Sequence, residues 1–443
     1  MDQALKPRMS LRDKTTLLLL VLMSVFLFAD QNIFFPASSR IMAEYGIGED
    51  YLGIVTSSFT IVGALVSMLF GVLADRGSRK KLLVFVVLVG EIPCLLTGFE
   101  FFTQTYTQLL ILRIMTGLGI GGIFPLTFSL IGDYFSAHHR PMANALVGAA
   151  WGIGQLMGGL VAGMVVATYG WRFPFILVAL PNFALVPLFL LVAREPQRGA
   201  QEEQVQELMA QGIQYKEKIR LRDLKPILTN KTNVLGYVQG IPGSLPWGIL
   251  PAYLILFFEV MKGFETDRAT FIFTMFGVGA TVGGILGAWA GQVLYRKDPR
   301  YLPILCGVTV LTGIIPAWIL FSFPWTPDSN LLFPILFGVF TGALITVAGP
   351  NIKAILMNVN APEHRGTVFA LHNIFDAIGR GLGPLIGGFM IVAMGYQFTL
   401  YFAALMWIPC GILYLLMAWT IRKDLVYLDN YMDNKKAKLE STA

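Results

Sequence analysis

The chain is poor in charge, and this shortage excludes a soluble protein. Only 14% of its 443 residues are charged, while 55% are hydrophobic and 33 are phenylalanine. A soluble fold of this composition would have more apolar surface than it could bury, so lipid must be the solvent for most of the chain. The net charge of +6 lies in short basic runs between apolar stretches, where membrane orientation explains it better than nucleic-acid binding.

Catalytic and cofactor-binding patterns are also scarce. The three cysteines, Cys94, Cys306 and Cys410, stand singly in different apolar stretches and offer neither a disulfide framework nor a metal site. The four histidines, two of them adjacent at His138-His139, supply no nucleophile–base or metal constellation. No G-x-x-x-x-G-K-[ST] loop is present, so we do not expect ATP hydrolysis. We therefore expect a protein that is not an enzyme and has no cofactor or metal.

Long apolar stretches fill most of the sequence. A helix needs roughly 20 mostly apolar residues to cross about 30 Å of hydrocarbon, and about twelve such stretches occur. The expected spans are 16–38, 51–73, 82–103, 107–131, 143–168, 173–193, 232–259, 268–294, 301–323, 331–356, 367–393 and 398–421. The predicted fold is therefore an all-α membrane protein made of two six-helix bundles.

The longest polar stretch separates the two groups of spans. We predict an N-terminal bundle over 1–194, a cytoplasmic linker over 195–230, a C-terminal bundle over 231–421 and a cytoplasmic tail over 422–443. The first span is too long for a signal-peptide core and is expected to be retained. The protein is expected to act as a monomer.

Basic residues give the expected orientation. With the N-terminus in the cytoplasm, most of the 33 Lys and Arg residues fall inside. The basic residues left outside are Arg40, Arg172, Lys262 and Arg268. We therefore expect both termini in the cytoplasm, with the protein in a plasma membrane, as in the inner membrane of bacteria.

Two parts of the chain repeat each other. Gly117, Pro125 and Arg140 are matched, at one fixed displacement, by Gly342, Pro350 and Arg365. The same displacement aligns the glycines Gly154, Gly158, Gly163 and Gly170 with Gly379, Gly383, Gly388 and Gly395. A chance match would not keep its spacing through so many positions. The chain is therefore built from two copies of one membrane unit.

Two motifs carry a family resemblance. The segment 71–80, GVLADRGSRK, resembles the G-x-L-A-D-R-x-G-R-K signature of the major facilitator superfamily, with the second glycine displaced by one position. Arg113, Gly117, Gly119 and Pro125 resemble its R-x-x-x-G-x-G motif with a downstream proline. The resemblance covers nearly the whole chain and implies a secondary transporter that works by alternating access.

Within that superfamily the chain looks most like the spinster-type transporters of lipids and organic anions. The likeness rests on Asp30 in the first span, the loop 71–80, Arg113 and a seventh span rich in tryptophan and glycine. The chain departs from that branch at Gln31 and Ile120, where an arginine and a glutamate are usual.

The loop after the second span is expected to gate the cytoplasmic side. A glycine allows close helix approach, and the Asp75 carboxylate can meet the positive end of a facing helix while arginines pair across the bundle. Cytoplasmic placement alone would explain the basic residues, but not Asp75. The residues assigned to the gate are Gly71, Asp75, Arg76, Arg79, Arg140 and Arg365.

Ionisable groups inside spans need a reason, because each costs about 2.5–3.5 kcal/mol at the centre of a helix. Counting about 1.5 Å per residue from the outer ends of their spans, Asp30 and Arg113 reach similar depths, and we predict that they pair. Binding of a proton, or of sodium, at Asp30 would couple an ion gradient to transport. The alternative is a permanent salt bridge between the first and fourth helices. Glu91, in the third span, has no partner in the sequence and receives no role.

The seventh and eleventh spans are the predicted substrate site. Three prolines and four glycines in 236–253 interrupt the seventh helix, which is tolerated where protein or a water-filled cavity satisfies the freed backbone groups. In the eleventh span, three polar residues at i, i+4 and i+8 line one face. They either line the cavity or bind a neighbouring helix, through Lys353. The predicted contacts are Gln239, Trp247, Tyr253, His372, Asp376 and Arg380, although packing explains the aromatic residues equally well.

The expected function is proton-coupled transport of a small anionic or amphipathic solute, such as a lysolipid or an organic acid. Arg113 and Arg380 can meet a carboxylate or phosphate. A multidrug or sugar carrier of the same superfamily is the alternative. A polytopic membrane enzyme or sensor is the hypothesis from a different functional class. The expected partners are the solute, protons or sodium, and membrane lipids, with no nucleic acid.

Overall fold

Helices are the only regular elements in the part of the chain that the structure describes. This computed structural model describes residues 10–134, 140–195, 224–361 and 364–440. They fall into two compact units, which we call unit 1 (Met1–Gly46 and Ser58–Glu217) and unit 2 (Ile47–Ser57 and Lys218–Ala443). The start of the second span thus groups with unit 2. The exact limits of the linker stay a prediction, since 196–223 lie outside the described residues.

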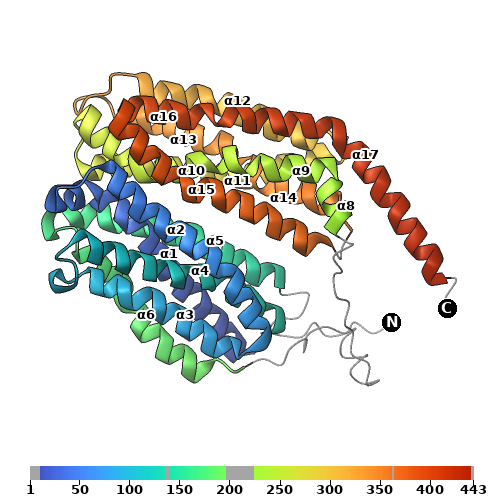
Figure 1. Ribbon diagram of the computed structural model, residues 1–443, viewed down its shortest axis with the longest axis horizontal. Helices are drawn as coiled ribbons and strands as arrows, with labels where there is room; N and C mark the ends of the chain where they lie inside the picture. The colour runs from blue at the N-terminus through green and yellow to red at the C-terminus, as the bar shows by residue number, and fades with distance from the viewer. Residues whose placement is uncertain (1–9, 135–139, 196–223, 362–363, 441–443) are drawn as a thin grey trace. The chain divides into compact units, whose positions relative to one another are not determined.

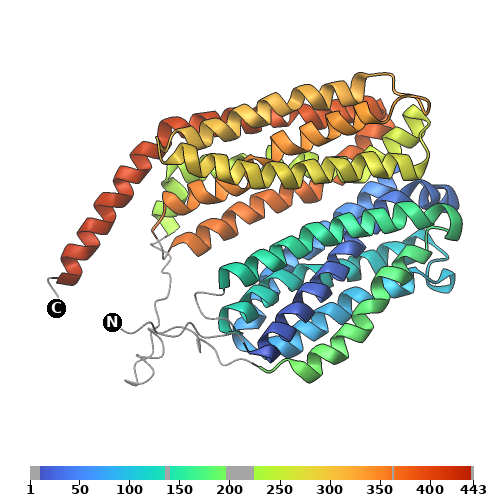
Figure 2. The same cartoon turned by 180° about the vertical axis from the view of Figure 1, so that it is seen from behind.

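Unit 1 contains the first group of spans. Its elements are α1 (Leu11–Tyr45), α2 (Glu49–Arg76, whose first residues belong to unit 2), α3 (Arg79–Thr97), the short 3-10 helix η1 (Glu100–Phe102), α4 (Tyr106–Tyr134), α5 (Arg140–Tyr169) and α6 (Phe173–Val192). Ser10 caps α1 by accepting a hydrogen bond from the amide of Asp13, and Gly46 ends that helix in the left-handed conformation. Helix α1 lies beside α5 and α6, and α3 lies beside α4 and α6 (Figures 1 and 2).

Glycines set the close approach of helices in unit 1. A Cβ atom on Gly158 would overlap the backbone of Ala29, so α5 can lie this close to α1 only with glycine there. A Cβ on Gly117 would likewise overlap the carbonyl of Phe59, where α4 crosses α2. Small residues at such crossings are the usual device for packing helices in lipid, where there is no hydrophobic force between them.

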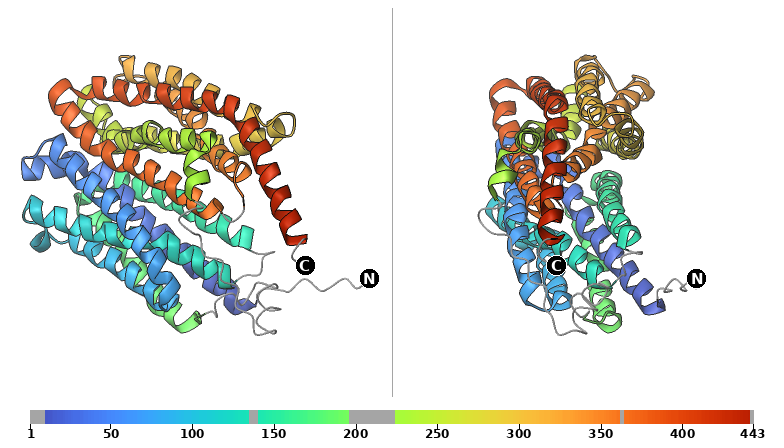
Figure 3. Two further views of the ribbon diagram at one scale, coloured as in Figure 1. Left: turned by 45° about the vertical axis from the view of Figure 1, so that its right-hand side comes forward. Right: turned by 90° about the vertical axis from the view of Figure 1, so that its right-hand side faces the viewer.

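Unit 2 contains the second group of spans. Its elements are α8 (Leu224–Thr229), α9 (Lys231–Val238), α10 (Gly240–Leu256), the π-helical turn η3 (Phe257–Met261), α11 (Thr266–Tyr295), α12 (Tyr301–Ser322), α13 (Leu332–Thr346), α14 (Ala348–Asn358), α15 (Arg365–Met394), α16 (Tyr396–Leu405) and α17 (Trp407–Glu440). The seventh span is thus divided into α9, α10 and η3. Helix α17 continues as far as Glu440, and its C-terminal part leaves the other helices of the unit (Figure 3).

The sequence repeat is visible in the packing of unit 2. A Cβ on Gly383 would clash with the carbonyl of Leu245 on α10, as one on Gly158 would clash with Ala29 on α1. A Cβ on Gly342 would overlap the carbonyl of Phe276 on α11, matching the contact at Gly117. The matched glycines therefore make matched helix crossings in the two units.

The described helices account for the expected spans. Eleven of them are long and apolar enough to cross a membrane. Helix α3 occupies the remaining expected position, and it carries three basic residues at its start and Glu91 in its interior. The chain is a multi-pass membrane protein with the twelve-helix architecture that its sequence predicts.

Candidate functional site

The predicted pair of Asp30 and Arg113 is present in the interior of unit 1. Arg113 Nη1 donates to Asp30 Oδ1 over 2.8 Å, and the two side chains are 3% and 0% exposed. The guanidinium carbon also lies 5.2, 4.6 and 5.6 Å from the ring centroids of Phe34, Phe59 and Phe175. Aromatic faces favour a cation at such distances. The arginine is therefore enclosed by one carboxylate and three rings, away from solvent.

A second polar pair lies in the same interior and was missed from the sequence. Asn182 on α6 donates through Nδ2 to Glu91 Oε1 on α3 over 2.5 Å, and to the carbonyl of Met23 over 3.2 Å. Glu91 is 0% exposed and Asn182 1% exposed. Asn182 is a single amide in an apolar span, and its only signal in the sequence is its polarity. Nothing in the spacing of the two residues links them.

The gate prediction is only partly described by the structure. The side chains of Asp75, Arg76, Arg140 and Arg365 lie outside the described residues. Arg79 is buried, and its guanidinium donates to the carbonyls of Ala74, over 3.3 Å, and Ser129, over 3.5 Å. It therefore joins the start of α3 to the end of α2 and to α4.

Gly71 does not have the packing role expected of it. A Cβ atom at this position would meet no atom within 4 Å, so no described helix packs closely against α2 there. The close crossings of α2 occur instead at Phe59 and Gly63, which face Gly117 and Gly121 on α4. The expected close approach at Gly71 was therefore wrong for this structure.

A carboxylate that the sequence placed in the linker caps α3. Glu195 accepts hydrogen bonds from Ser78 Oγ over 2.5 Å, from the amide of Arg79 over 2.9 Å and from the amide of Lys80 over 3.2 Å. Free amides at a helix N-terminus attract an anion. The segment that follows α6 is thereby attached to the loop after α2, a contact with no local sequence signal.

In unit 2, Asp376 and Arg380 form an ion pair along α15. Arg380 Nη2 donates to Asp376 Oδ2 over 2.7 Å, and the side chains are 39% and 34% exposed. Arg380 Nε is buried and has no hydrogen-bond partner among the described residues. Lys353, the expected partner from another helix, is exposed. Among the described residues, the pair is therefore partly open to its surroundings, and the buried Nε donor has no acceptor.

The third residue of the α15 stripe contacts a neighbouring helix. His372 is 5% exposed, and its Nδ1 lies 3.2 Å from the carbonyl of Gly236. Gln239 Nε2 donates to the same carbonyl over 3.0 Å. Gly236 precedes the break between α9 and α10. Side chains of the protein, rather than an open cavity, therefore satisfy this carbonyl.

Two more predicted contacts differ in their surroundings. Tyr253 is 0% exposed, and its hydroxyl lies 2.6 Å from the carbonyl of Pro384 and 3.1 Å from that of Glu49, both within unit 2. Trp247 is partly exposed, with its ring 5.7 Å from that of Phe276.

The predicted substrate contacts thus divide into two groups. Trp247, Asp376 and Arg380 present surface in this structure. Gln239, Tyr253 and His372 are buried, and packing and backbone hydrogen bonds occupy their polar atoms, so their role as substrate contacts stays a prediction.

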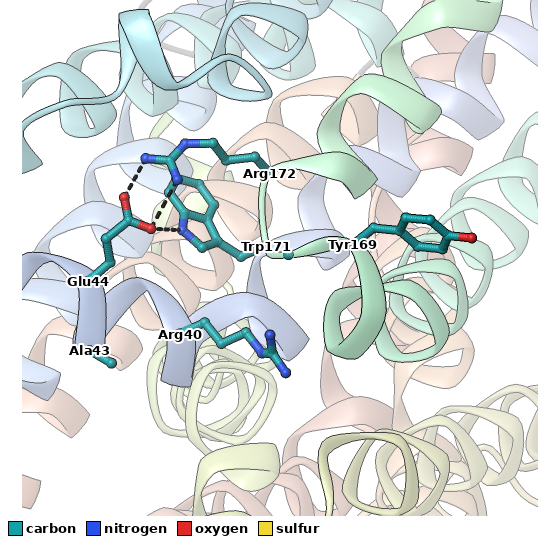
Figure 4. Close-up of a pocket in the computed structure, with 7 residues that line it drawn as sticks. Arg40, Ala43, Glu44, Tyr169, Trp171 and Arg172 are labelled. Carbon is teal, nitrogen blue, oxygen red and sulfur yellow. Dashed lines mark hydrogen bonds and ion pairs between the residues drawn. The ribbon is translucent and has the colours of Figure 1, made fainter.

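A surface hollow lies at one end of unit 1, away from the buried pair. It is lined by Arg40, Ala43, Glu44, Tyr169, Gly170, Trp171 and Arg172. Figure 4 shows Trp171 and Arg172 directed toward the Glu44 carboxylate. Trp171 Nε1 donates to it over 2.6 Å and Arg172 Nη1 over 3.0 Å. These contacts tie the end of α1 to the turn between α5 and α6.

Comparison with known proteins agrees with this architecture. Residues 20–349 match the Major Facilitator Superfamily. A putative metabolite transport protein of Haemophilus influenzae is 27% identical over 366 residues, covering 79% of this chain and 83% of that protein. The multidrug resistance protein MdtG of Salmonella typhimurium is 27% identical over 347 residues, covering 78% and 80%.

Solved structures share the fold. A bacterial homologue of the human lysosomal transporter Spinster, in an inward-facing and unoccupied conformation, matches with a TM-score of 0.81 and 18% identity, covering 94% of this chain and 99% of that one. A D-xylose–proton symporter matches with a TM-score of 0.69 and 17% identity, covering 90% and 96%. The spinster-type likeness thus holds at the level of fold. The match over most of the sequence makes this protein a transporter rather than an enzyme, and the chain belongs to the Major Facilitator Superfamily.

Proposed function

We propose that the protein is a proton-coupled secondary transporter that moves a small anionic or amphipathic solute by alternating access. The observation that carries the proposal is the buried pair of Asp30 and Arg113. A proton on Asp30 would leave the enclosed guanidinium without its counter-charge, and an uncompensated buried charge is unfavourable. Protonation therefore favours any arrangement, or any bound anion, that satisfies Arg113 in another way.

The solute class rests on unit 2. Arg380 offers an exposed edge, and Asp376 neutralises its charge only from one side. A guanidinium with free donors binds carboxylate or phosphate in a forked geometry, and the partly exposed Trp247 supplies an apolar face. An organic acid or a lysolipid combines these two features. MdtG is named as a multidrug resistance protein, so a multidrug carrier is the alternative, and sodium is the alternative to the proton.

The same proposal includes the topology. We propose that both termini lie in the cytoplasm, that the protein lies in the inner membrane of a bacterium, and that one chain forms the transporting unit. The loop 71–80 is assigned to a cytoplasmic gate, with the buried Arg79 as the member of that gate whose contacts are described.

The coupling is tested with purified protein in liposomes that carry a pH gradient. Parent protein should accumulate the solute when the gradient is imposed and stop when an uncoupler collapses it. Asp30→Asn should lose accumulation but keep exchange between labelled and unlabelled solute, because exchange requires no net proton movement. Asp328→Asn removes a carboxylate from an exposed loop, outside both the proposed proton site and the proposed solute site, and is the matched control. Full accumulation by Asp30→Asn would exclude the coupling role.

The solute is found by thermal stabilisation, since a ligand that binds the native state raises its melting temperature. Lysolipids, organic acids, sugars and cationic drugs are compared on the same preparation. Stabilisation by cationic drugs alone would replace the anionic proposal with the multidrug alternative.

A further inference from the structure

Glu91 is a buried carboxylate that the proposed mechanism does not yet use. It lies in the interior of α3 and is 0% exposed. Its Oε1 accepts a hydrogen bond from Asn182, but its Oε2 has no partner. Asp30 Oδ2 and Asn182 Oδ1 are also buried without partners in the described structure. This interior therefore contains three acceptor oxygens that lack a donor.

Helices α1, α4 and α6 neighbour α3, and two of them bring a charged residue into this interior. Helix α1 packs against α3 where Leu27 lies beside Gly90, and it presents Asp30 about one turn further along, while α4 presents Arg113, whose guanidinium is already bound to Asp30. Helix α6 carries no charged residue between Phe173 and Val192.

Helix α3 itself carries four further ionisable side chains, one cysteine and three basic residues. Cys94 lies one turn away and is buried, with its Sγ 3.7 Å from the carbonyl of Phe175, and the basic residues at the start of the helix lie about 15–18 Å away along its axis. Among the described residues, the cluster therefore has two carboxylates and one cation.

Electroneutrality then decides the state of the cluster. With Asp30 ionised and paired to Arg113, an ionised Glu91 would be a buried anion with no cation of its own, which proteins avoid by protonation. A proton on Glu91 also converts one of the three unpartnered acceptors into a donor. One proton per cluster satisfies both the charge and the hydrogen-bond deficit.

We propose that Glu91 binds a proton in the resting protein and forms, with Asp30, Arg113 and Asn182, a proton-holding site of two carboxylates and one guanidinium. Transfer of this proton breaks the O–H bond on Glu91 and forms one on Asp30, with no change in net charge. Glu91 is then the second proton-binding group of the coupled site. The assignment deepens the proposed function, but it is tested without transport.

The test is infrared difference spectroscopy of the full-length protein in lipid, recorded in H₂O and D₂O at neutral pH. A protonated buried carboxyl group gives a carbonyl stretching band that shifts on deuteration. The parent should show this band, Glu91→Gln should lose it, and Glu100→Gln, at an exposed glutamate in η1, should keep it. A band that survives in Glu91→Gln and disappears in Asp30→Asn would place the proton on Asp30 and overturn the proposal.

A second variant keeps the test valid if Glu91→Gln folds poorly. Asn182→Ala leaves Glu91 in place but removes the hydrogen bond to its Oε1. The band should then keep its intensity and move in frequency. A band of unchanged frequency would show that it belongs to another group.

Transport measurements separate this inference from the proposed function. If the parent shows no proton-driven accumulation, the proposed function fails, and the infrared band still decides whether Glu91 holds a proton. If accumulation is proton-driven and Glu91→Gln leaves its pH profile unchanged, Glu91 takes no part in coupling.

Discussion

The two copies of the repeat keep the same helix crossings but place their charges differently. The contacts at Gly158 with Ala29, and at Gly383 with Leu245, fix the register between the copies. Because Ala29 and Leu245 make equivalent contacts, Asp30 corresponds to Pro246, and the displacement of the sequence repeat aligns Arg113 with Gly338. The second copy thus has no counterpart of the buried ion pair, and its first helix is divided into α9, α10 and η3.

The fifth helix of each copy shows the opposite difference, because there the charged pair belongs to the second copy. Asp376 and Arg380 on α15 correspond to Trp151 and Gln155 on α5. The pair of unit 1 joins two helices and is excluded from solvent, whereas the pair of unit 2 lies along one helix and is more than one-third exposed on average. The helix crossings are therefore the same in the two copies, whereas the positions of the ionisable groups differ.

The largest expected effect concerns the buried pair. The double variant Asp30→Asn/Glu91→Gln leaves Arg113 without a carboxylate, and breaking a buried ion pair costs about 3–5 kcal/mol. In Asp30→Asn alone, release of the proton from Glu91 restores a counter-charge, so a smaller loss is expected. Asp376→Asn in unit 2 should cost about 0–1 kcal/mol, because its pair is partly solvated. Denaturation of all three variants in one detergent checks this order. Equal losses in the two single variants and the double variant would contradict it.

The next effect tests the shared crossings. Gly158→Ala and Gly383→Ala each place a methyl group against the backbone of a facing helix, and overpacking of this kind costs about 1–3 kcal/mol. Gly159→Ala is the matched control, since a Cβ there meets no atom within 4 Å. It should be neutral or slightly stabilising, because alanine favours a helix over glycine. Melting temperatures of the purified variants decide whether the two copies depend on their glycines alike.

A third prediction concerns the exposed pair of unit 2. Arg380→Lys keeps the charge but loses the forked geometry, and should weaken an anionic solute by about 1–3 kcal/mol, the range for hydrogen bonds to charged groups. The melting temperature should change little. Binding and melting are measured on one preparation, with Lys353→Arg, at another exposed cation of unit 2, as the control. Reduced stability with unchanged affinity would show that Arg380 is structural.

These comparisons show what the sequence could reveal. Lipid requires long apolar helices, so the spans were predictable from apolar length, and the repeat was predictable from the spacing of its glycines. Each intramembrane charge is costly, so the similar depths of Asp30 and Arg113 predicted that they pair. The contacts of Arg79 were not predictable, because they involve backbone carbonyls that any residue supplies.

Other contacts of the candidate site depend on tertiary structure in the same way. The pairing of Glu91 with Asn182, and the capping of α3 by Glu195, join residues far apart in the chain with no repeated spacing. The proline-rich seventh span correctly indicated a helix break. It did not indicate that the side chains of Gln239 and His372 would both contact the carbonyl of Gly236.

The smallest expected effect concerns the loops that correspond in the two copies. In unit 1 the loop before α3 binds Glu195, a carboxylate that follows the last helix of the unit. In unit 2 the arrangement is reversed, because Asp298 lies in the loop before α12 and Arg422 comes from the last helix, with 2.5 Å between Arg422 Nη2 and Asp298 Oδ2. The backbone amide of Arg300 lowers the pKa of Asp298, burial opposes this shift, and Arg422 adds to it.

A lowered pKa means that ionised Asp298 stabilises the fold above its unfolded pKa, which is about 3.9, and that this stabilisation is lost as the pH falls through the folded value. Asp298→Asn should therefore lower the melting temperature slightly at pH 7 and have no effect once the parent carboxyl is protonated in acid. Because Asp298 and Arg422 lie at the surface, added salt should reduce the difference at pH 7. Asp328→Asn, at another exposed loop aspartate of unit 2, controls for the lost charge. A deficit in Asp298→Asn that stays constant from pH 7 into acid would show that the side chain acts through packing rather than through its charge.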